Sequence, residues 1–275
     1  MLTDYHVHLR PDDDGTEFDK YFTSRNAEAY REAATEKGIT ELGISEHIHR
    51  FHQALDVWDH PFWCQNAADD LEEYVAFLQD ETDFKIGIEA DFVAGREDRM
   101  GNLLDRFEWD YVVGSVHFLQ DRAVDMQGAY DVWGRGESPD KIWKRYFLTL
   151  AEAARTGQYD IMAHPDLVKI WGSGHLPDKD PKFFYEYAVE AFVEAGVAVE
   201  VSTAGLRKPV GELYPGRDFL EMVVEAGCPI ALSSDAHVPE HLGFGYDQAL
   251  EALEEAGVTE LCVFSGRERS LEPIG

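Results

Sequence analysis

The chain has 275 residues and a formal net charge of −30, from 54 acidic against 24 basic side chains. Such an acidic surface argues against nucleic acid as the main partner, because binding to phosphate backbones needs basic side chains. Its apolar runs are far shorter than the ~18 residues of a membrane span, so no membrane partner is expected. No signal segment precedes the first strand and the 3 cysteines are widely spaced. We therefore expect a cytoplasmic protein without a disulfide framework.

Short β-branched runs alternate with amphipathic helical stretches along the whole chain, which is typical of a parallel α/β fold. No linker or internal repeat interrupts this alternation, so one domain is expected over residues 1–275. After a first strand ending near residue 8, strands are expected at 39–45, 84–89, 110–115, 159–163, 197–201, 229–233 and 260–264. Helices are expected between them at 26–37, 69–79, 139–156, 182–195, 219–225 and 247–255.

Two unusually long loops, 47–64 and 117–133, are rich in His, Trp and Phe. Loops of this length inside a compact domain are often lids or binding loops. Alternatively, the aromatic side chains of Trp58, Phe62 and Trp63 only pack the first loop onto the barrel. The sequence leaves both interpretations open.

Potential metal ligands stand at the ends of nearly all the expected strands. His6 and His8 lie two residues apart, so on an extended strand their rings project to the same side and form half of a metal site. The later strands end in His47, Glu89, His117, His164, Asp235 and His237. The carboxyl ends of barrel strands surround one mouth, so these side chains should meet there. Imidazole and carboxylate without thiolate favour Zn, Mn or Fe, and eight ligands exceed what one tetrahedral ion needs.

The motifs that carry these ligands run through the chain in order. They are His6-Val7-His8, Glu46-His47, Gly87-Ile88-Glu89, Gly114-Ser115-Val116-His117, Ala163-His164-Pro165 and Ser234-Asp235-Ala236-His237. This series resembles the polymerase-and-histidinol-phosphatase (PHP) family. Within that family, the segments 114–118 and 200–208 resemble the histidinol-phosphate phosphatase branch. The resemblance implies a distorted TIM-like (βα)7 barrel with a trinuclear metal site at the carboxyl ends of the strands.

The resemblance also implies how three divalent ions, whether Zn, Mn or Fe, would share the ligands. The first ion would be held by His6, His8, Glu89 and Asp235, the second by Glu89, His117 and His164, and the third by His47, His237 and Asp14. Asp12 or Asp13 is the alternative to Asp14 if the loop shifts by one or two residues.

Three further residues are candidates for substrate binding. Arg207 is similar to the arginine with which the family grips phosphate, a task that suits a planar two-donor fork. Its alternative role is that of a surface arginine on a loop. Lys169 and His49 are expected to assist, and Asp166 is a candidate for orienting a ligand imidazole.

These features predict a metal-dependent phosphomonoesterase, with L-histidinol phosphate, an intermediate of histidine biosynthesis, as the best substrate. Arg207, Glu89 and Asp235 would be its catalytic residues, and a hydroxide bridging two metals would attack phosphorus. The alternatives are a PHP phosphoesterase acting on another small phosphate ester or a nucleotide, and a non-catalytic PHP module. An amidohydrolase-like barrel is a further option, but no lysine stands at a strand end to bridge its metals.

Overall fold

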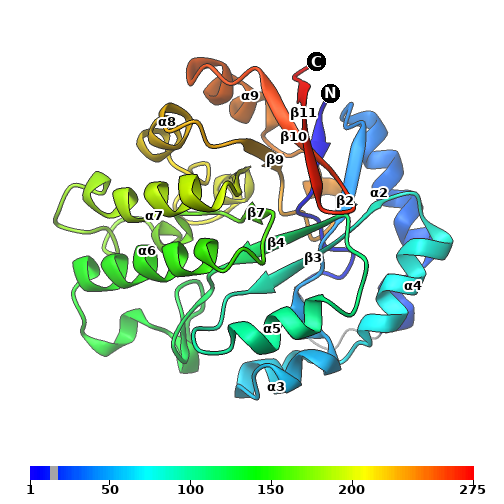
Figure 1. The fold of residues 1–275 in the computed structure, drawn as a ribbon, viewed down its shortest axis with the longest axis horizontal. Coiled ribbons are helices and arrows are strands. Elements are labelled where there is room, and N and C mark those ends of the chain that lie inside the picture. The colour runs from blue at the N-terminus through cyan, green and yellow to red at the C-terminus, as the bar shows by residue number, and fades with distance from the viewer. Residues whose placement is uncertain (13–17) are drawn as a thin grey trace.

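Seven parallel strands form a nearly closed barrel in the computed structural model, which describes residues 1–12 and 18–275 (Figure 1). In sheet order they are β1 (Thr3–Asp4), β2 (Glu41–Ile44), β3 (Lys85–Asp91), β4 (Tyr111–Ser115), β7 (Ile161–Met162), β8 (Ala198–Ser202) and β9 (Ile230–Ser233). The two edge strands approach each other just beyond their ends. There Val7 forms a parallel bridge with Ala236, and the His8 N–H donates to the Ala236 carbonyl at 2.8 Å. The distorted (βα)7 barrel expected from the sequence is confirmed.

Helices surround this barrel and cover the outer faces of its strands (Figure 1). They are α1 (Phe18–Tyr21), α2 (Ser24–Glu36), α3 (Pro61–Asn66), α4 (Leu71–Glu81), α5 (Glu97–Leu104), α6 (Pro139–Arg155), α7 (Lys182–Ala195), α8 (Arg217–Glu225) and α9 (Tyr246–Glu255). All six expected helices are present. The sequence did not predict α1, α3 or α5, of which α5 has only eight residues and carries Gly101 in its middle. None of the described helices has the length and apolar character that crossing a bilayer requires.

Apolar side chains fill the amino-terminal half of the barrel. The Tyr111 ring lies across its interior, and a Cβ atom at Gly43 or Gly87 would come within 2.3 Å of that ring or its hydroxyl. Both positions must therefore lack a side chain. Tyr111 belongs to a cluster of buried side chains that also contains Tyr5, Val113, Ile161, Ala163, Ala198, Ala231, Cys262 and Phe264.

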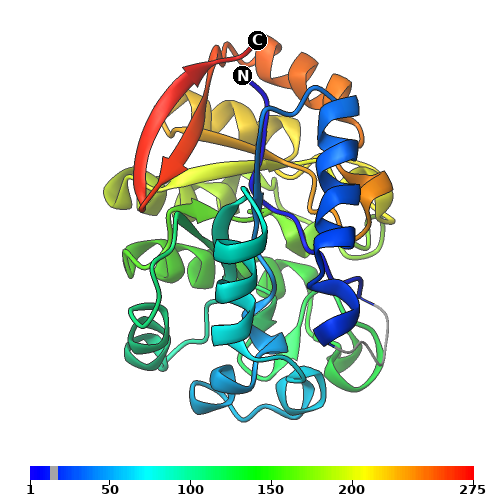
Figure 2. The same ribbon diagram turned by 90° about the vertical axis from the view of Figure 1, so that its right-hand side faces the viewer.

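A carboxyl-terminal hairpin closes this end of the barrel. The strand expected at 260–264 is present as β10 (Glu260–Ser265), but it pairs with a further strand, β11 (Glu268–Pro273). The Phe264 N–H donates to the Tyr5 hydroxyl at 3.1 Å, and Arg267 pairs with Asp160 at 2.9 Å just before β7. Figure 2 shows the hairpin and the α3 segment at opposite ends of the molecule. The hairpin thus leaves the other end of the barrel for a site.

The two long loops are ordered and pack against each other. Loop 47–64 contains two 3-10 turns and the start of α3, and loop 117–133 contains the small hairpin β5 (Phe118–Leu119) and β6 (Arg122–Ala123). The Trp58 ring stacks on His60 at 4.3 Å and meets Phe118 of the second loop edge-on at 5.1 Å. Trp58 and Trp63 are buried, whereas Phe62 lines a cleft described below. Packing therefore accounts for the two tryptophans.

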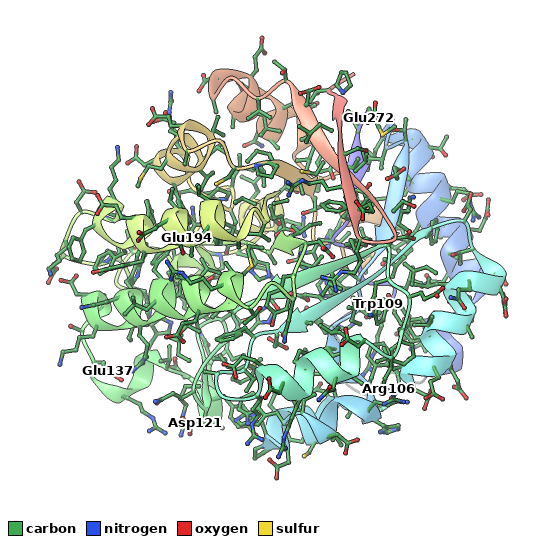
Figure 3. The ribbon with its side chains drawn as sticks, in the orientation of Figure 1. Arg106, Trp109, Asp121, Glu137, Glu194 and Glu272 are labelled. Carbon is green, nitrogen blue, oxygen red and sulfur yellow. The ribbon has the colours of Figure 1, made fainter. Side chains whose placement is uncertain are left out.

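The strong negative charge generates a prediction about stability. Acidic residues on separate elements, among them Asp121, Glu137 and Glu272, lie around the periphery (Figure 3). Their mutual repulsion destabilises the compact state and is screened as the Debye length falls from about 10 Å at 0.1 M salt to about 3 Å at 1 M. We expect KCl over this range to raise Tm by about 5 °C, measured by circular dichroism. Sucrose at equal osmolality controls for solute exclusion. A Tm that salt raises no more than sucrose does would contradict the prediction.

Candidate metal centre

The His-x-His segment after β1 places two imidazoles against the same two carboxylates. His6 Nε2 lies 3.4 Å from Glu89 Oε2 and 3.7 Å from Asp235 Oδ1. His8 Nε2 lies 3.7 Å and 3.4 Å from the same two oxygen atoms. The extended backbone at residues 6–8 accounts for this, because alternate side chains project to one side. His6, His8 and Asp235 form a group whose ligand atoms lie within 4.8 Å of one another.

Glu89, near the carboxyl end of β3, joins this group to a second set of imidazoles. Its Oε1 atom lies 3.5 Å from His117 Nε2 and 3.4 Å from His164 Nε2. Its Oε2 atom contacts His47 Nδ1. One buried carboxylate is therefore surrounded by rings from several strand ends, as a bridging ligand would be.

A third group lies beside the first. His237 Nε2 is 3.4 Å from His47 Nε2, and the rings of His47 and His237 both stack on His8 with centroids 4.2 Å away. Asp12 Oδ1 lies 3.1 Å from His237 Nε2 and 3.8 Å from His47 Nε2. Asp14, the carboxylate expected here, lies outside the described residues, as does Asp13.

The polar atoms of these groups test whether a metal fits. Several are buried and have no hydrogen-bond partner among the described residues: His6 Nε2, both ring nitrogens of His8, His47 Nδ1, both carboxylate oxygens of Glu89, and Asp235 Oδ1. Buried polar atoms are normally paired, because leaving one unpaired costs free energy. These are all atoms that can donate an electron pair to a cation. The residues therefore fit divalent metal ions, and their type suits Zn, Mn or Fe.

Two buried carboxylates form hydrogen bonds with ligand rings from behind, and a third lies near such a ring. His6 Nδ1 lies 2.8 Å from Glu200 Oε1, and His117 Nδ1 lies 2.6 Å from Asp91 Oδ1. Glu46 Oε2 lies 3.7 Å from His8 Nδ1. The two hydrogen bonds leave the Nε2 atoms of His6 and His117 free to face a metal. No sequence motif assigns these three acids a role, although Asp91 stands two residues after Glu89 and so faces the same side of the strand.

The expected orienting role of Asp166 is not seen. Its Oδ2 atom lies 2.9 Å from Lys169 Nζ and accepts the Gly216 N–H at 2.8 Å. His164 Nδ1 has no hydrogen-bond partner in the described part of the chain. Asp166 therefore fixes the loop after β7 rather than a ligand ring.

The charge states of the candidate ligands follow from their surroundings. Burial acts to raise the pKa of Glu89, but the imidazoles of His6 and His117 help to hold that pKa well below its usual value. Burial likewise acts to raise the pKa of Asp235, but His6 and His8 hold that pKa well below its usual value. Burial holds the pKa of His47 well below its usual value. Ionised carboxylates and a neutral imidazole are the forms that bind metal.

His6 differs from His47 in its charge state. Burial acts to lower its pKa, but the carboxylates of Glu200 and Glu89 raise that pKa well above the usual value. A proton therefore has to leave His6 before the ring can act as a ligand, which couples metal binding to pH.

A cleft of about 420 Å³ opens beside His47 and His117. Its wall includes His49, whose Nδ1 lies 3.5 Å from Asp91 Oδ2, together with Phe62 and the exposed Lys208. His49, one of the expected substrate contacts, is thus placed where a ligand can enter. Lys208, which directly follows Arg207, was not among the residues expected at the site.

Arg207 and Lys169 are placed differently. Arg207 Nη2 donates to the carbonyls of Ser234 and Asp235 at 2.8 and 2.9 Å, while its buried Nη1 has no described hydrogen-bond partner. Lys169 Nζ pairs with Asp166 and donates to the Leu213 carbonyl at 2.8 Å. The charge of Lys169 is already balanced, so a role in substrate binding stays a prediction for this residue. Arg207 lies beside the metal-ligand segment.

Comparison with known proteins agrees with the geometry. A probable histidinol-phosphatase of Deinococcus radiodurans is 32% identical over 254 residues, covering 89% of this chain and 91% of the relative. The histidinol-phosphatase of Lactococcus lactis is 22% identical over 273 residues, covering 96% and 94%. The crystal structure of histidinol phosphate phosphatase from that organism, complexed with zinc, L-histidinol and phosphate, has the same fold, with a TM-score of 0.74 at 20% identity over 98% of both chains.

The family assignment rests on the segment that contains most of the candidate ligands. Residues 4–204 match the model of the PHP domain, which spans β1 to the end of β8. Asp235 and His237 lie beyond the matched segment, but the barrel brings Asp235 against His6 and His8 and stacks the His237 ring on His8. From this match and the 32% identity to the Deinococcus protein, we conclude that the chain belongs to the PHP domain family.

Proposed function

We propose that this protein is a metal-dependent phosphomonoesterase that hydrolyses L-histidinol phosphate to L-histidinol and phosphate. The observation that carries the proposal is the set of unpartnered imidazole and carboxylate atoms at the barrel mouth. The Deinococcus relative, which matches nine-tenths of this chain, supports the substrate through its name. The Lactococcus structure supports it through its bound L-histidinol and phosphate. An intact donor set argues against a non-catalytic module.

Three zinc ions are the cofactor that we propose. The donors fall into three overlapping groups, in which His6 and His8 each occur twice: His6, His8 and Asp235; His6, Glu89 and His164; and His8, His47 and His237. His117 Nε2, 3.5 Å from Glu89 Oε1, is a further donor beside the second group. When bound, divalent ions supply a water molecule of lowered pKa and positive charge for the phosphate oxygens.

The chain's own residues position the substrate. Arg207 Nη2 is fixed by the two carbonyls next to the metal-ligand segment, which leaves the buried Nη1 to donate to a phosphate oxygen. A charge-assisted bond of this kind is both strong and directional. Phe62 and Phe118 of the two long loops line the adjoining cleft and supply apolar surface for the alcohol part of the ester. The same two side chains keep water from that part of the cleft.

A panel of esters tests the substrate. We expect the zinc-loaded protein to hydrolyse L-histidinol phosphate with a kcat/KM at least about 100-fold above that for p-nitrophenyl phosphate or a mononucleotide. The reason is that neither of the other two esters carries an aliphatic amine and an imidazole beside its phosphate. Phosphate release measures all three rates. Similar kcat/KM values would contradict the assignment of L-histidinol phosphate as the specific substrate but would still support a phosphatase. If no ester is hydrolysed, the non-catalytic module is favoured.

Arg207 is tested by two substitutions. In Arg207→Ala, KM should rise about 10- to 100-fold with a smaller fall in kcat, because a charged hydrogen bond to the phosphate is lost. Arg207→Lys should restore only part of the loss, since the fork geometry is absent. Arg217→Ala, which removes an exposed guanidinium, is the matched control.

Metal content separates two roles for Arg207. If it binds phosphate, the alanine variant keeps all its metal. A variant that loses metal would instead show that Arg207 holds the Asp235 segment in place through its two carbonyl contacts. Unchanged kinetics would place Arg207 outside the site.

The third ion is tested by metal analysis. Asp12 is already paired with Arg50 at 2.8 Å, so we expect Asp14 to supply the carboxylate beside His47 and His237. Asp14→Ala should then bind about two ions per chain in place of about three, with a large loss of activity. Elemental analysis of Asp14→Ala, Asp12→Ala and the unmodified chain, prepared side by side, measures this. Loss of an ion from Asp12→Ala alone would move the ligand to Asp12, and three ions in both variants would leave both as turn residues.

A further inference from the structure

Asp125, in the second long loop, has a carboxylate that plays no part in the reaction proposed above. Its backbone is held firmly by its neighbour Val124, whose carbonyl accepts the indole N–H groups of Trp133 and Trp171, each at 2.9 Å. The Val124 N–H donates to the His117 carbonyl at 2.9 Å. Asp125 is therefore presented from a rigid segment tied directly to a candidate metal ligand.

The Asp125 side chain lines the same cleft as His117 and Phe118. Its Oδ1 atom is buried, and no described residue forms a hydrogen bond with it. Burial raises the pKa of Asp125, and the nearby His117 only partly opposes this effect. A buried carboxylate oxygen without a partner costs free energy unless a ligand pairs with it.

The two arginines that line the cleft are committed elsewhere, and the third cation of its wall, Lys208, is exposed and forms no hydrogen bond with Asp125 Oδ1. Arg10 Nη1 pairs with Asp69 at 2.5 Å, and Arg50 Nη1 pairs with Glu46 at 2.5 Å. The partner that Asp125 lacks is thus a hydrogen-bond donor, preferably a cation, brought in by a ligand. The net charge of −30 favours the approach of such a cation.

We propose that Asp125 determines substrate specificity by binding the protonated amine of the alcohol part of the ester. The site would then prefer phosphate esters of amino alcohols over those of neutral alcohols. This inference rests on the proposed function. In L-histidinol phosphate the amine is carried by the carbon next to the CH2–O–phosphate group, so it must bind close to the metal centre. The link from Asp125 through Val124 to His117 meets that requirement.

Two esters and two variants test the proposal. The esters are L-histidinol phosphate and 3-(imidazol-4-yl)propyl phosphate, which lacks only the amine. In Asp125→Asn, kcat/KM for the first should fall about 30-fold, mainly through KM, while the value for the second stays within about two-fold. Asp121→Asn, an exposed carboxylate of the same loop, is the control and should leave both values unchanged. An equal loss on both esters would overturn the proposal.

Calorimetry and metal analysis make the outcome independent of turnover. The zinc-loaded wild-type protein should bind L-histidinol at least about 10-fold more tightly than 3-(imidazol-4-yl)propan-1-ol, and Asp125→Asn should lose this difference. Lower metal content in Asp125→Asn would overturn the proposal by showing that Asp125 positions His117 or His164. If the wild-type protein hydrolyses neither ester, the proposed function fails. The binding comparison then still decides the role of Asp125: no preference for the amine overturns it.

Discussion

The rest of the structure depends on the contacts between the carboxylate of Glu89 and the imidazoles around it. The carboxylate is buried, and both of its oxygens face imidazoles that come from strand ends far apart in the chain, including His6, His47 and His164. A charge in such a place is tolerable only if opposite charges or donors surround it. Those groups meet only where the carboxyl ends of all the strands meet. The closed parallel barrel is thus a condition for the site as well as a way to bury apolar surface.

The two ends of the barrel have different roles: one is filled by apolar side chains and the other holds the candidate site. At the amino-terminal end, Tyr111 and the β10–β11 hairpin fill the interior with apolar side chains and aromatic rings. At the other end the same strands carry unpartnered polar atoms, which lower the stability of an ion-free chain. The carboxylates of Glu200 and Asp91 hold the rings of His6 and His117 there, so the positions of these rings depend on the strands more than on the long loops. The burial of apolar side chains at the amino-terminal end therefore offsets the free-energy cost of the unpartnered polar atoms at the other end.

Much of the fold and of the candidate site could be predicted because each candidate ligand stands at or just beyond the end of a strand. Local sequence marks those positions, and the barrel brings them together. Other features depend on distant partners. Glu200 lies within the buried strand β8, and its role follows only from His6, 194 residues away in the chain. Lys169 was expected near phosphate, but its charge is balanced by Asp166, three residues before it. Helix α5 was missed because eight residues around a glycine give little periodic signal.

An acidic chain that binds a phosphate ester has to solve an electrostatic problem. A net charge of −30 repels an anion at long range, and salt screens that repulsion only partly. The proposed substrate eases this problem, because it carries a cationic amine beside its phosphate. Divalent ions and Arg207 would balance the phosphate at short range, while the carboxylate of Asp125 would face the amine. The separation of opposite charges along the cleft would then orient the ester. The same acidic surface that repels simple anions would thus accept an ester that carries both a positive and a negative group.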